Sequence, residues 1–184
     1  MLKHTPAATL LVTLFLIGCT RDASQDATKK PLAFNDFENV DGWLADSPAL
    51  ATLSRDKAHS GIYSTAVSPG HEFSLGYNNA LSRLAPDWPA KLTVSAWVLL
   101  PDDQAAAQLV TEVKQANSQA PGLLWQSIDL VNTVKVYGKW QHVEQAVAMP
   151  AGAKPGSRLL VYLWRANSKQ PVYLDDLQIT LGSK

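Results

Sequence analysis

The sequence has a single cysteine, Cys19, so it can form neither an intrachain disulfide nor a cysteine-rich metal cluster. It also lacks an excess of one charge, because 16 basic residues balance 16 acidic ones among the 184 residues. Without a basic surplus the attraction to phosphate that dominates nucleic-acid binding is missing, and we expect no nucleic-acid partner. Charged residues are few (17%) and hydrophobic residues many (46%), which excludes a disordered chain and supplies the core of one domain.

The chain begins with a short basic segment and an apolar run over residues 7–17, which is too short to cross a bilayer as a helix. This arrangement is typical of a secretory signal peptide. The run ends in Leu16-Ile17-Gly18-Cys19, and this motif resembles the lipobox of bacterial lipoproteins. The resemblance implies a signal peptide over residues 1–18, cleaved to leave a lipidated Cys19. The alternative is an ordinary signal peptide with an incidental cysteine.

A lipoprotein of this kind lies in the bacterial cell envelope, where acyl chains anchor it to a membrane without a transmembrane helix. Thr20 rather than aspartate follows the cysteine, and by resemblance to enterobacterial sorting this favours the outer membrane, with the domain facing the periplasm or the surface. Residues 19–31 are polar and have no apolar periodicity, so they predict a flexible tether. We expect one folded domain over residues 32–184.

Short strand-like segments with turn signals between them recur along this domain. The expected strands are 33–38, 51–55, 62–67, 72–77, 91–100, 108–114, 122–130, 140–149, 158–165 and 172–181. No persistent helical stripe accompanies them. The pattern predicts an all-β fold, a single antiparallel β-sandwich.

The last expected strand carries two adjacent acids, Asp175 and Asp176, between apolar residues. Neighbouring side chains in a strand point to opposite faces, so one acid is expected to reach solvent and the other to face the packed side. A buried carboxylate needs a cation, a cluster of hydrogen-bond donors or a metal ion. Residues 33–38 form a second apolar segment with acids. We predict that the two segments meet and fasten the ends of the sandwich around a site of the calcium type.

Four short motifs occur in one order along the domain, namely Phe34-Asn35-Asp36-Phe37-Glu38 with Gly42-Trp43, His59-Ser60-Gly61-Ile62-Tyr63-Ser64, Trp140-Gln141-His142-Val143, and Tyr173-Leu174-Asp175-Asp176-Leu177. In this order they resemble the CenC-like carbohydrate-binding modules, which are galactose-binding-like jelly rolls often joined to glycoside hydrolases. The resemblance implies a two-sheet jelly roll with a structural Ca²⁺ where the first and last strands meet. It assigns Glu38 and Asp175 as the side-chain ligands, with carbonyls from residues 57–60.

The residues alone do not decide whether a metal ion is bound or which acids would bind it. Asp36 and Asp176 are alternative ligands, because the sequence does not fix the strand parity. Without a metal, Asp175 would accept hydrogen bonds from backbone amides or pair with Arg55 or Lys57.

Six tryptophans and five tyrosines supply flat faces for core packing or for stacking on a sugar. If their strands are neighbours, alternation places four candidates on one side of the sandwich: Trp125, Trp164, Tyr77 and Glu112. Aromatic faces suit the C–H-rich surfaces of sugars and polar side chains suit the hydroxyls, so these residues predict a groove for a glycan or polysaccharide. Core packing is the alternative for each aromatic residue.

Signatures of catalysis are missing, since there is no GxSxG elbow, no HExxH motif and no phosphate-binding glycine loop. Glu112 and Asp129 would form a glycosidase-like acid pair only if they faced each other across a groove. We therefore expect a membrane-anchored lipoprotein with a non-catalytic module that recognises a glycan, and no enzyme. The alternative is a structural or assembly lipoprotein that contacts another envelope protein through a sandwich face.

Overall fold

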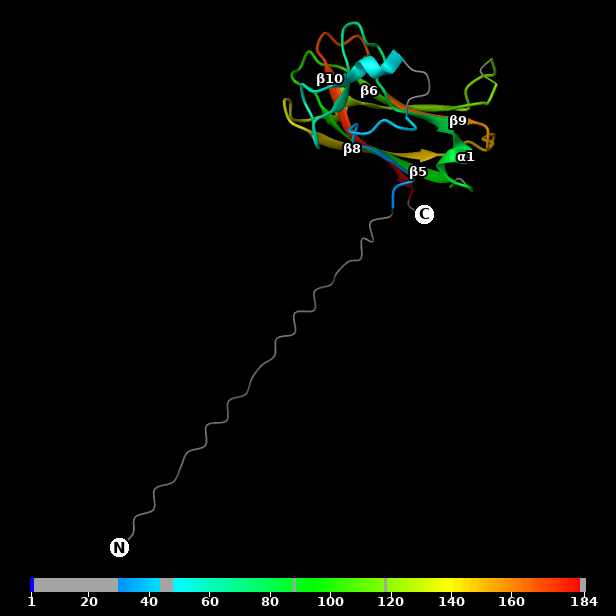
Figure 1. Ribbon diagram of the computed structural model, residues 1–184, viewed down its shortest axis with the longest axis horizontal. Helices are drawn as coiled ribbons and strands as arrows, with labels where there is room; N and C mark the ends of the chain where they lie inside the picture. The colour runs from blue at the N-terminus through cyan, green and yellow to red at the C-terminus, as the bar shows by residue number, and fades with distance from the viewer. Residues whose placement is uncertain (2–29, 44–47, 88, 118, 183–184) are drawn as a thin grey trace.

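The structure, a computed structural model, describes residues 1, 30–43, 48–87, 89–117 and 119–182. The predicted signal peptide, the lipidation of Cys19 and the tether up to residue 29 lie outside the described residues. Two antiparallel sheets pack face to face as a sandwich around one hydrophobic core (Figure 1), which confirms the predicted fold class. Within the described ranges, no helix is long and apolar enough to cross a bilayer.

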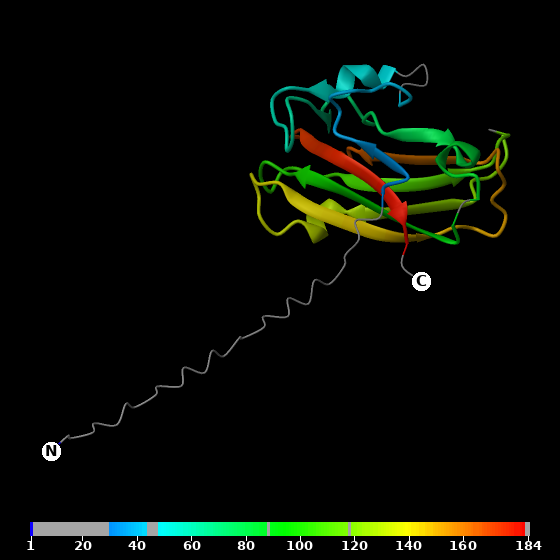
Figure 2. The same cartoon turned by 60° about the horizontal axis from the view of Figure 1, so that its bottom comes forward.

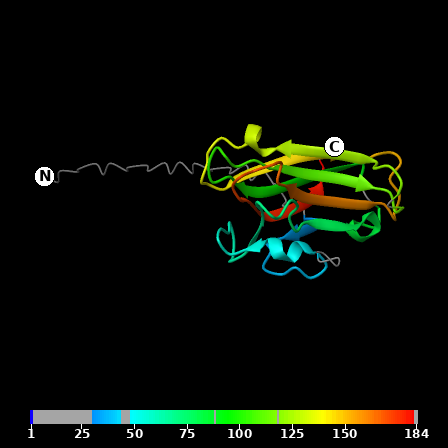
Figure 3. The same ribbon diagram turned by 90° about the horizontal axis from the view of Figure 1, so that it is seen from above.

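The larger sheet has six strands and the smaller has four. The order in the larger sheet is β2 (Leu53–Ser54), β3 (Ser64–Val67), β10 (Val172–Leu181), β5 (Lys91–Leu99) and β8 (Gln141–Ala148), with β1 (Ala33–Asn35) also paired to β10. The order in the smaller sheet, seen in Figure 3, is β4 (Tyr77–Ala80), β9 (Arg158–Trp164), β6 (Gln108–Lys114) and β7 (Leu124–Asp129). Short helices η1 (Pro48–Thr52), α1 (Leu81–Leu84) and α2 (Leu130–Thr133) lie in the connections.

The first and last strands of the domain lie side by side, as predicted. β1 pairs antiparallel with residues 177–179 of β10, and β3 pairs with residues 172–174 along the same edge. Figure 2 shows β10 in red, with the short blue segment of β1 along one side and β5 along the other. The last strand is therefore interior to its sheet and holds three other strands in place.

β9 shows how the sequence divides the smaller sheet into an inner and an outer face. Leu159, Val161 and Leu163 are completely buried, whereas the residues that alternate with them are only partly buried. This period of two is what a strand with one packed face requires. The outward residues, Leu160 and Tyr162 among them, are thus free to form a surface on the sandwich.

At the edge of the smaller sheet, the predicted strand over residues 72–77 is not found as predicted. The regular strand there is β4, which begins at Tyr77, and the chain before it is irregular. The backbone amide of Leu75 donates to the hydroxyl of Thr52 at 2.8 Å instead of joining a ladder. Ser74 still donates its amide to the Leu163 carbonyl at 3.1 Å, so the segment follows β9 without regular pairing.

Candidate functional site

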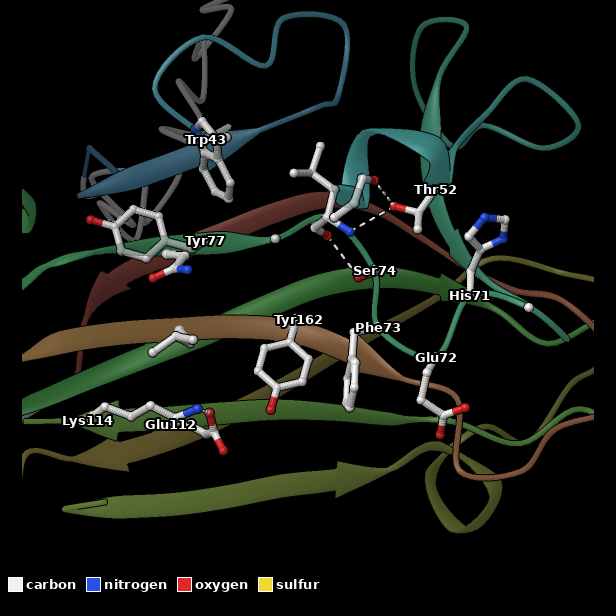
Figure 4. Close-up of a pocket in the computed structure, with 16 residues that line it drawn as sticks. Trp43, Thr52, His71, Glu72, Phe73, Ser74, Tyr77, Glu112, Lys114 and Tyr162 are labelled. Atoms are coloured by element: carbon white, nitrogen blue, oxygen red, sulfur yellow. Dashed lines mark hydrogen bonds and ion pairs between the residues drawn. The ribbon is translucent and has the colours of Figure 1, made fainter. Parts of the chain in front are cut away.

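A groove of about 550 Å³ lies on the outer face of the smaller sheet (Figure 4). Its floor is formed by outward side chains of β9 and β6, and its wall by residues 70–78, which are the irregular chain before β4 and the start of β4 itself. Trp43 closes one end. The groove is therefore bounded on one side by the chain before β4, which follows β9 without regular strand pairing.

The strand register brings the floor residues together. Glu112 of β6 lies opposite Leu160 of β9 on one side and opposite Trp125 of β7 on the other. Tyr162 lies opposite the next outward position of β6, Val110. Directly opposite residues of an antiparallel pair point to the same face, so these side chains share one surface.

Phe73 and Tyr162 form the aromatic part of the groove. Their ring centroids are 5.7 Å apart and the rings meet edge to face at 82°. Phe73 is 55% exposed, so its ring is available to a ligand. Burial, and then the negative charge of Glu112, raise the pKa of Tyr162 to about 12, so that its hydroxyl keeps its proton. An exposed ring beside a hydroxyl donor suits a sugar, which offers both C–H groups and hydroxyls.

The polar part of the groove consists of charged groups that are already paired. The Nζ atom of Lys114 lies 2.8 Å from Oε2 of Glu112, and the lysine side chain is half exposed. At the groove edge Arg158 donates to Oδ1 of Asn78 from Nε at 3.0 Å and from Nη2 at 2.7 Å. The Glu112 side chain is mostly buried, so the pair is only partly exposed, and these groups present fixed donors and acceptors to the groove.

Two of the predicted sugar-binding residues, Trp125 and Trp164, lie on this outer face. Trp125 is 52% exposed and is not a core residue. Trp164 is oriented by Glu72, because its indole nitrogen donates to Oε1 at 2.8 Å while Arg165 donates to Oε2 at 2.8 Å. The hydrogen bonds from Arg165 and then from Trp164 lower the pKa of Glu72, so this carboxylate is engaged in holding the tryptophan.

Of the other two predicted residues, Glu112 lines the groove floor and Tyr77 lines the groove end from within the core. Tyr77 is only 6% exposed, and its ring meets Trp43 edge to face at 5.3 Å. Phe73 was not among the predicted residues, although regular alternation would place it on the same side as Leu75 and Tyr77. In the structure Leu75 and Tyr77 are buried and Phe73 is exposed. The one sequence signal for this break is Gly76, where an added Cβ would lie 2.0 Å from a β9 carbonyl.

The acid pair considered for catalysis is not brought together. Asp129 lies opposite Gln108, four residues along β6 from Glu112, which is about 13 Å away. Its Oδ1 atom instead accepts the backbone amides of Val131 at 3.0 Å and Asn132 at 3.4 Å, which caps α2. The two acids therefore do not face each other across the groove.

A second group of candidate residues lies where the first and last strands meet. Asp175 is fully buried there, and its carboxylate accepts the backbone amides of His59 at 2.7 Å, Ser60 at 3.1 Å and Asp176 at 2.7 Å. Burial raises the pKa of Asp175 to about 6, although these three hydrogen bonds act in the opposite direction. This is the amide arrangement that the sequence left open as the alternative to a metal.

The neighbouring acid does not point away to solvent, as simple alternation predicts. The register of β10 shifts between Asp175 and Gln178, and Asp176 has a positive φ of 48°. This irregularity turns Asp176 toward the same segment, where it contacts the His59 ring at 2.6 Å and the Ser60 hydroxyl at 2.7 Å. Two consecutive acids therefore hold one turn.

Glu38 fastens the same turn from the other side. Its Oε1 atom accepts the backbone amides of Ile62 at 2.7 Å and Tyr63 at 2.6 Å. Gly61 stands against this carboxylate with a positive φ of 58°, and an added Cβ would lie 2.5 Å from it. The two predicted ligands, Glu38 and Asp175, thus bind adjacent parts of one turn.

Calcium requires several oxygen ligands, and the junction of the first and last strands is rich in oxygen. Within the part of the chain that the structure describes, no group of three or more His, Cys, Asp or Glu side chains is placed to hold a metal ion. The carbonyls of Lys57 and Ala58 already accept side-chain hydrogen bonds at 2.6 and 3.1 Å. Calcium bound by Glu38 and Asp175 stays a prediction, and in the structure both carboxylates accept backbone amides.

Comparison with solved structures finds the same fold in carbohydrate-binding modules. The CBM22-1 xylan-binding domain of Paenibacillus barcinonensis Xyn10C is similar with a TM-score of 0.55 and 20% identity, over 85% of this chain and 97% of that one. A family 16 carbohydrate-binding module is similar with a TM-score of 0.54 and 14% identity, over 79% and 95%. The CBM22-1–GH10 modules of Clostridium thermocellum xylanase 10B, complexed with xylohexaose, give a TM-score of 0.54 and 16% identity over 84% and 29%.

No protein-family model and no curated protein sequence matches the chain. At such low identities the likeness to solved structures shows the fold alone. The chain therefore has the jelly-roll fold of carbohydrate-binding modules, and what it binds has to be argued from its own groove.

Gly61→Ala is expected to destabilise the domain more than Gly42→Ala. Both glycines have a positive φ, 58° and 78°, so alanine is strained at both positions. Only at Gly61 would the new Cβ displace Glu38 from its two amides, whereas nothing lies within 4 Å at Gly42. We expect a difference of about 2 kcal/mol in the free energy of unfolding, measured in urea. Equal losses in the two variants would show that Glu38 does not hold this turn.

Calcium is expected to raise the melting temperature at neutral pH relative to EDTA, because an ion that binds only the folded state stabilises it. Without a cation, the raised pKa of Asp175 makes the folded state retain a proton that the unfolded chain releases. Stability should then fall as the pH rises from 3.8 to about 6.

A calcium ion at Asp175 would offset this loss, so its stabilising effect should be small at the acid end of that range and complete above it. Thermal melts followed by circular dichroism measure the effect across this pH range. Asp175→Asn should abolish the response to calcium. Identical wild-type melts in calcium and EDTA at neutral pH would exclude the metal.

Proposed function

We propose that the domain is a non-catalytic module that binds a polysaccharide in the groove of the smaller sheet. The observation that carries this proposal is the exposed ring of Phe73 next to Tyr162, in a hollow whose floor presents Glu112 and Lys114. Apolar faces with a few convergent polar groups are what a sugar-binding site requires. The rings would stack on sugar faces, and the charged pair would bind hydroxyls.

The structural neighbours support xylan as the first polysaccharide to test. The Paenibacillus barcinonensis domain is described as xylan-binding, and the Clostridium thermocellum xylanase modules were crystallised with xylohexaose. For the C-terminal family 22 module of Clostridium thermocellum Xyn10B, which has a TM-score of 0.51, ligand binding is assigned to a cleft. A hollow lined by aromatic and charged residues fits this role better than the alternative, a flat apolar surface for another envelope protein.

Phe73→Ala is expected to weaken binding to xylan about tenfold, or about 1.4 kcal/mol, because one stacking face is lost. The melting temperature should change little, since the ring is more than half exposed. Affinity electrophoresis in gels that contain soluble xylan or a soluble plant glucan measures the binding, and no reducing ends should be released.

Phe34→Ala is the matched control for this variant. Phe34 is 48% exposed but lies on β1, in the other sheet, so its loss should leave binding unchanged. Failure of the wild-type protein to bind any of the polysaccharides would favour a protein partner. Unchanged retardation of Phe73→Ala would remove the groove from the proposal.

We also propose that a lipid on Cys19 anchors the protein in the bacterial cell envelope, at the outer membrane. The support is the Leu16-Ile17-Gly18-Cys19 motif after a basic start, together with the absence of any other cysteine in the sequence. Multiple acyl chains hold a protein stably on a bilayer, and the polar residues 20–31 would connect the anchor to the glycan-binding domain.

Cys19→Ser is expected to abolish incorporation of radiolabelled palmitate and to release the protein from the membrane fraction of a Gram-negative host. Thr20→Asp should keep the label but move the protein to the inner membrane on a sucrose gradient. Label incorporation that persists in Cys19→Ser would contradict lipidation at this residue, because no other thiol is present.

A further inference from the structure

A second hollow, of about 340 Å³, lies on the same face of the smaller sheet. It is lined by Trp125, by residues 122–124, and by Glu112 and Lys114. The last two residues also line the larger groove. The two hollows therefore meet at the Glu112–Lys114 ion pair and are parts of one surface, which runs from the wall over residues 70–78 to the opposite edge of the sheet.

Three aromatic residues follow one another across this surface, with the acid between the second and the third. Phe73 forms a bridge to Trp164 and so lies one strand position beyond β9, whereas Tyr162 lies on β9, Glu112 on β6 and Trp125 on β7. Figure 4 shows Phe73, Tyr162 and Glu112 in this order along the groove. Phe73 is level with Trp164, and the register places that level at Asp129 of β7, four residues from Trp125. Three strand spacings (about 14 Å) and four residues along the strand (about 13 Å) therefore separate Phe73 from Trp125, a distance of about 19 Å between their backbones.

The centre of this path can bind hydroxyl groups. Oε2 of Glu112 has the Lys114 ammonium at 2.8 Å but, among the described residues, no aligned hydrogen bond. Lys114 is half exposed and can move aside, so that a hydroxyl donates to the carboxylate and the ammonium donates to a second oxygen. A ligand that crosses the sheet would thus meet aromatic rings at both ends and charged hydrogen-bonding groups in the middle.

We propose that the two hollows form one extended site, which takes a linear glycan chain of about four or more sugar units, with Trp125 as the stacking surface at its far end. This inference rests on the proposed function. A mono- or disaccharide is shorter than the path and would leave one of the two hollows in water. Selection for chain length follows, because each further sugar adds contacts only until the chain reaches Trp125.

Calorimetric titration of the full-length protein with xylotriose and with xylohexaose tests this inference. The wild-type protein should bind the hexasaccharide about tenfold more tightly than the trisaccharide. Trp125→Ala should remove most of this difference by weakening hexasaccharide binding, whereas Trp125→Phe should preserve it, since a flat ring remains. Phe73→Ala should weaken the binding of both sugars, and Phe34→Ala, on the other sheet, of neither.

Failure of the inference is distinct from failure of the proposed function. Equal wild-type affinity for the two sugars would overturn the extended site while leaving the groove as a sugar site. The extended site would also be overturned if Trp125→Ala weakened the binding of both sugars by the same factor, or left the binding of both unchanged. Absence of binding to both sugars would overturn the inference together with the proposal that the groove binds xylan.

Discussion

The buried carboxylate of Asp175 is the constraint on which the arrangement of this domain depends. A carboxylate without solvent must be matched by donors, and here three backbone amides supply them. Two of these amides belong to the turn over residues 59–63, which Glu38 holds from the other side. Because Glu38 follows β1 and Asp175 lies in β10, the same hydrogen bonds tie the first strand to the last. A strand paired with three neighbours thereby becomes the fixed centre of the larger sheet.

This centre also determines where the groove lies. Thr52 shares a hydrogen bond of 3.0 Å with Thr65 of β3, which pairs with β10, and it accepts the amide of Leu75 at 2.8 Å. One side chain therefore connects the larger sheet to the wall of the groove on the smaller sheet. The wall follows β9 without regular pairing at Leu75, whose amide is bound to Thr52, and Phe73 is exposed above the floor. The surface proposed for the glycan is thus supported from a strand on the other side of the sandwich.

Elements that depend on local sequence signals were predicted correctly, whereas a feature that depends on a contact distant in sequence was not. β6 and β10 begin and end at the predicted residues, because turn residues and alternation of side chains are local signals. The pairing of β1 with β10 could also be predicted, because both segments are apolar and carry acids that need partners. The wall of the groove could not be predicted, because the hydrogen bond that interrupts the strand pairing joins Leu75 to the hydroxyl of Thr52, 23 residues earlier. No local pattern records such a contact, and Phe73 was therefore not predicted, whereas Trp125 and Glu112, which line the hollows, lie on strands with regular alternation.

The charges of the groove favour recognition at short range. Lys114 is paired with Glu112, and Arg165 with Glu72, so these two positive charges each lie beside a negative one. The whole sequence is likewise balanced, with 16 residues of each sign. Such a surface has little long-range field with which to attract an ionic ligand, and paired groups act mainly through the directions of their hydrogen bonds. For the proposed glycan, affinity would then come from exposed rings and from hydroxyl contacts, and both would increase with the length of an uncharged polymer that lies across the sheet.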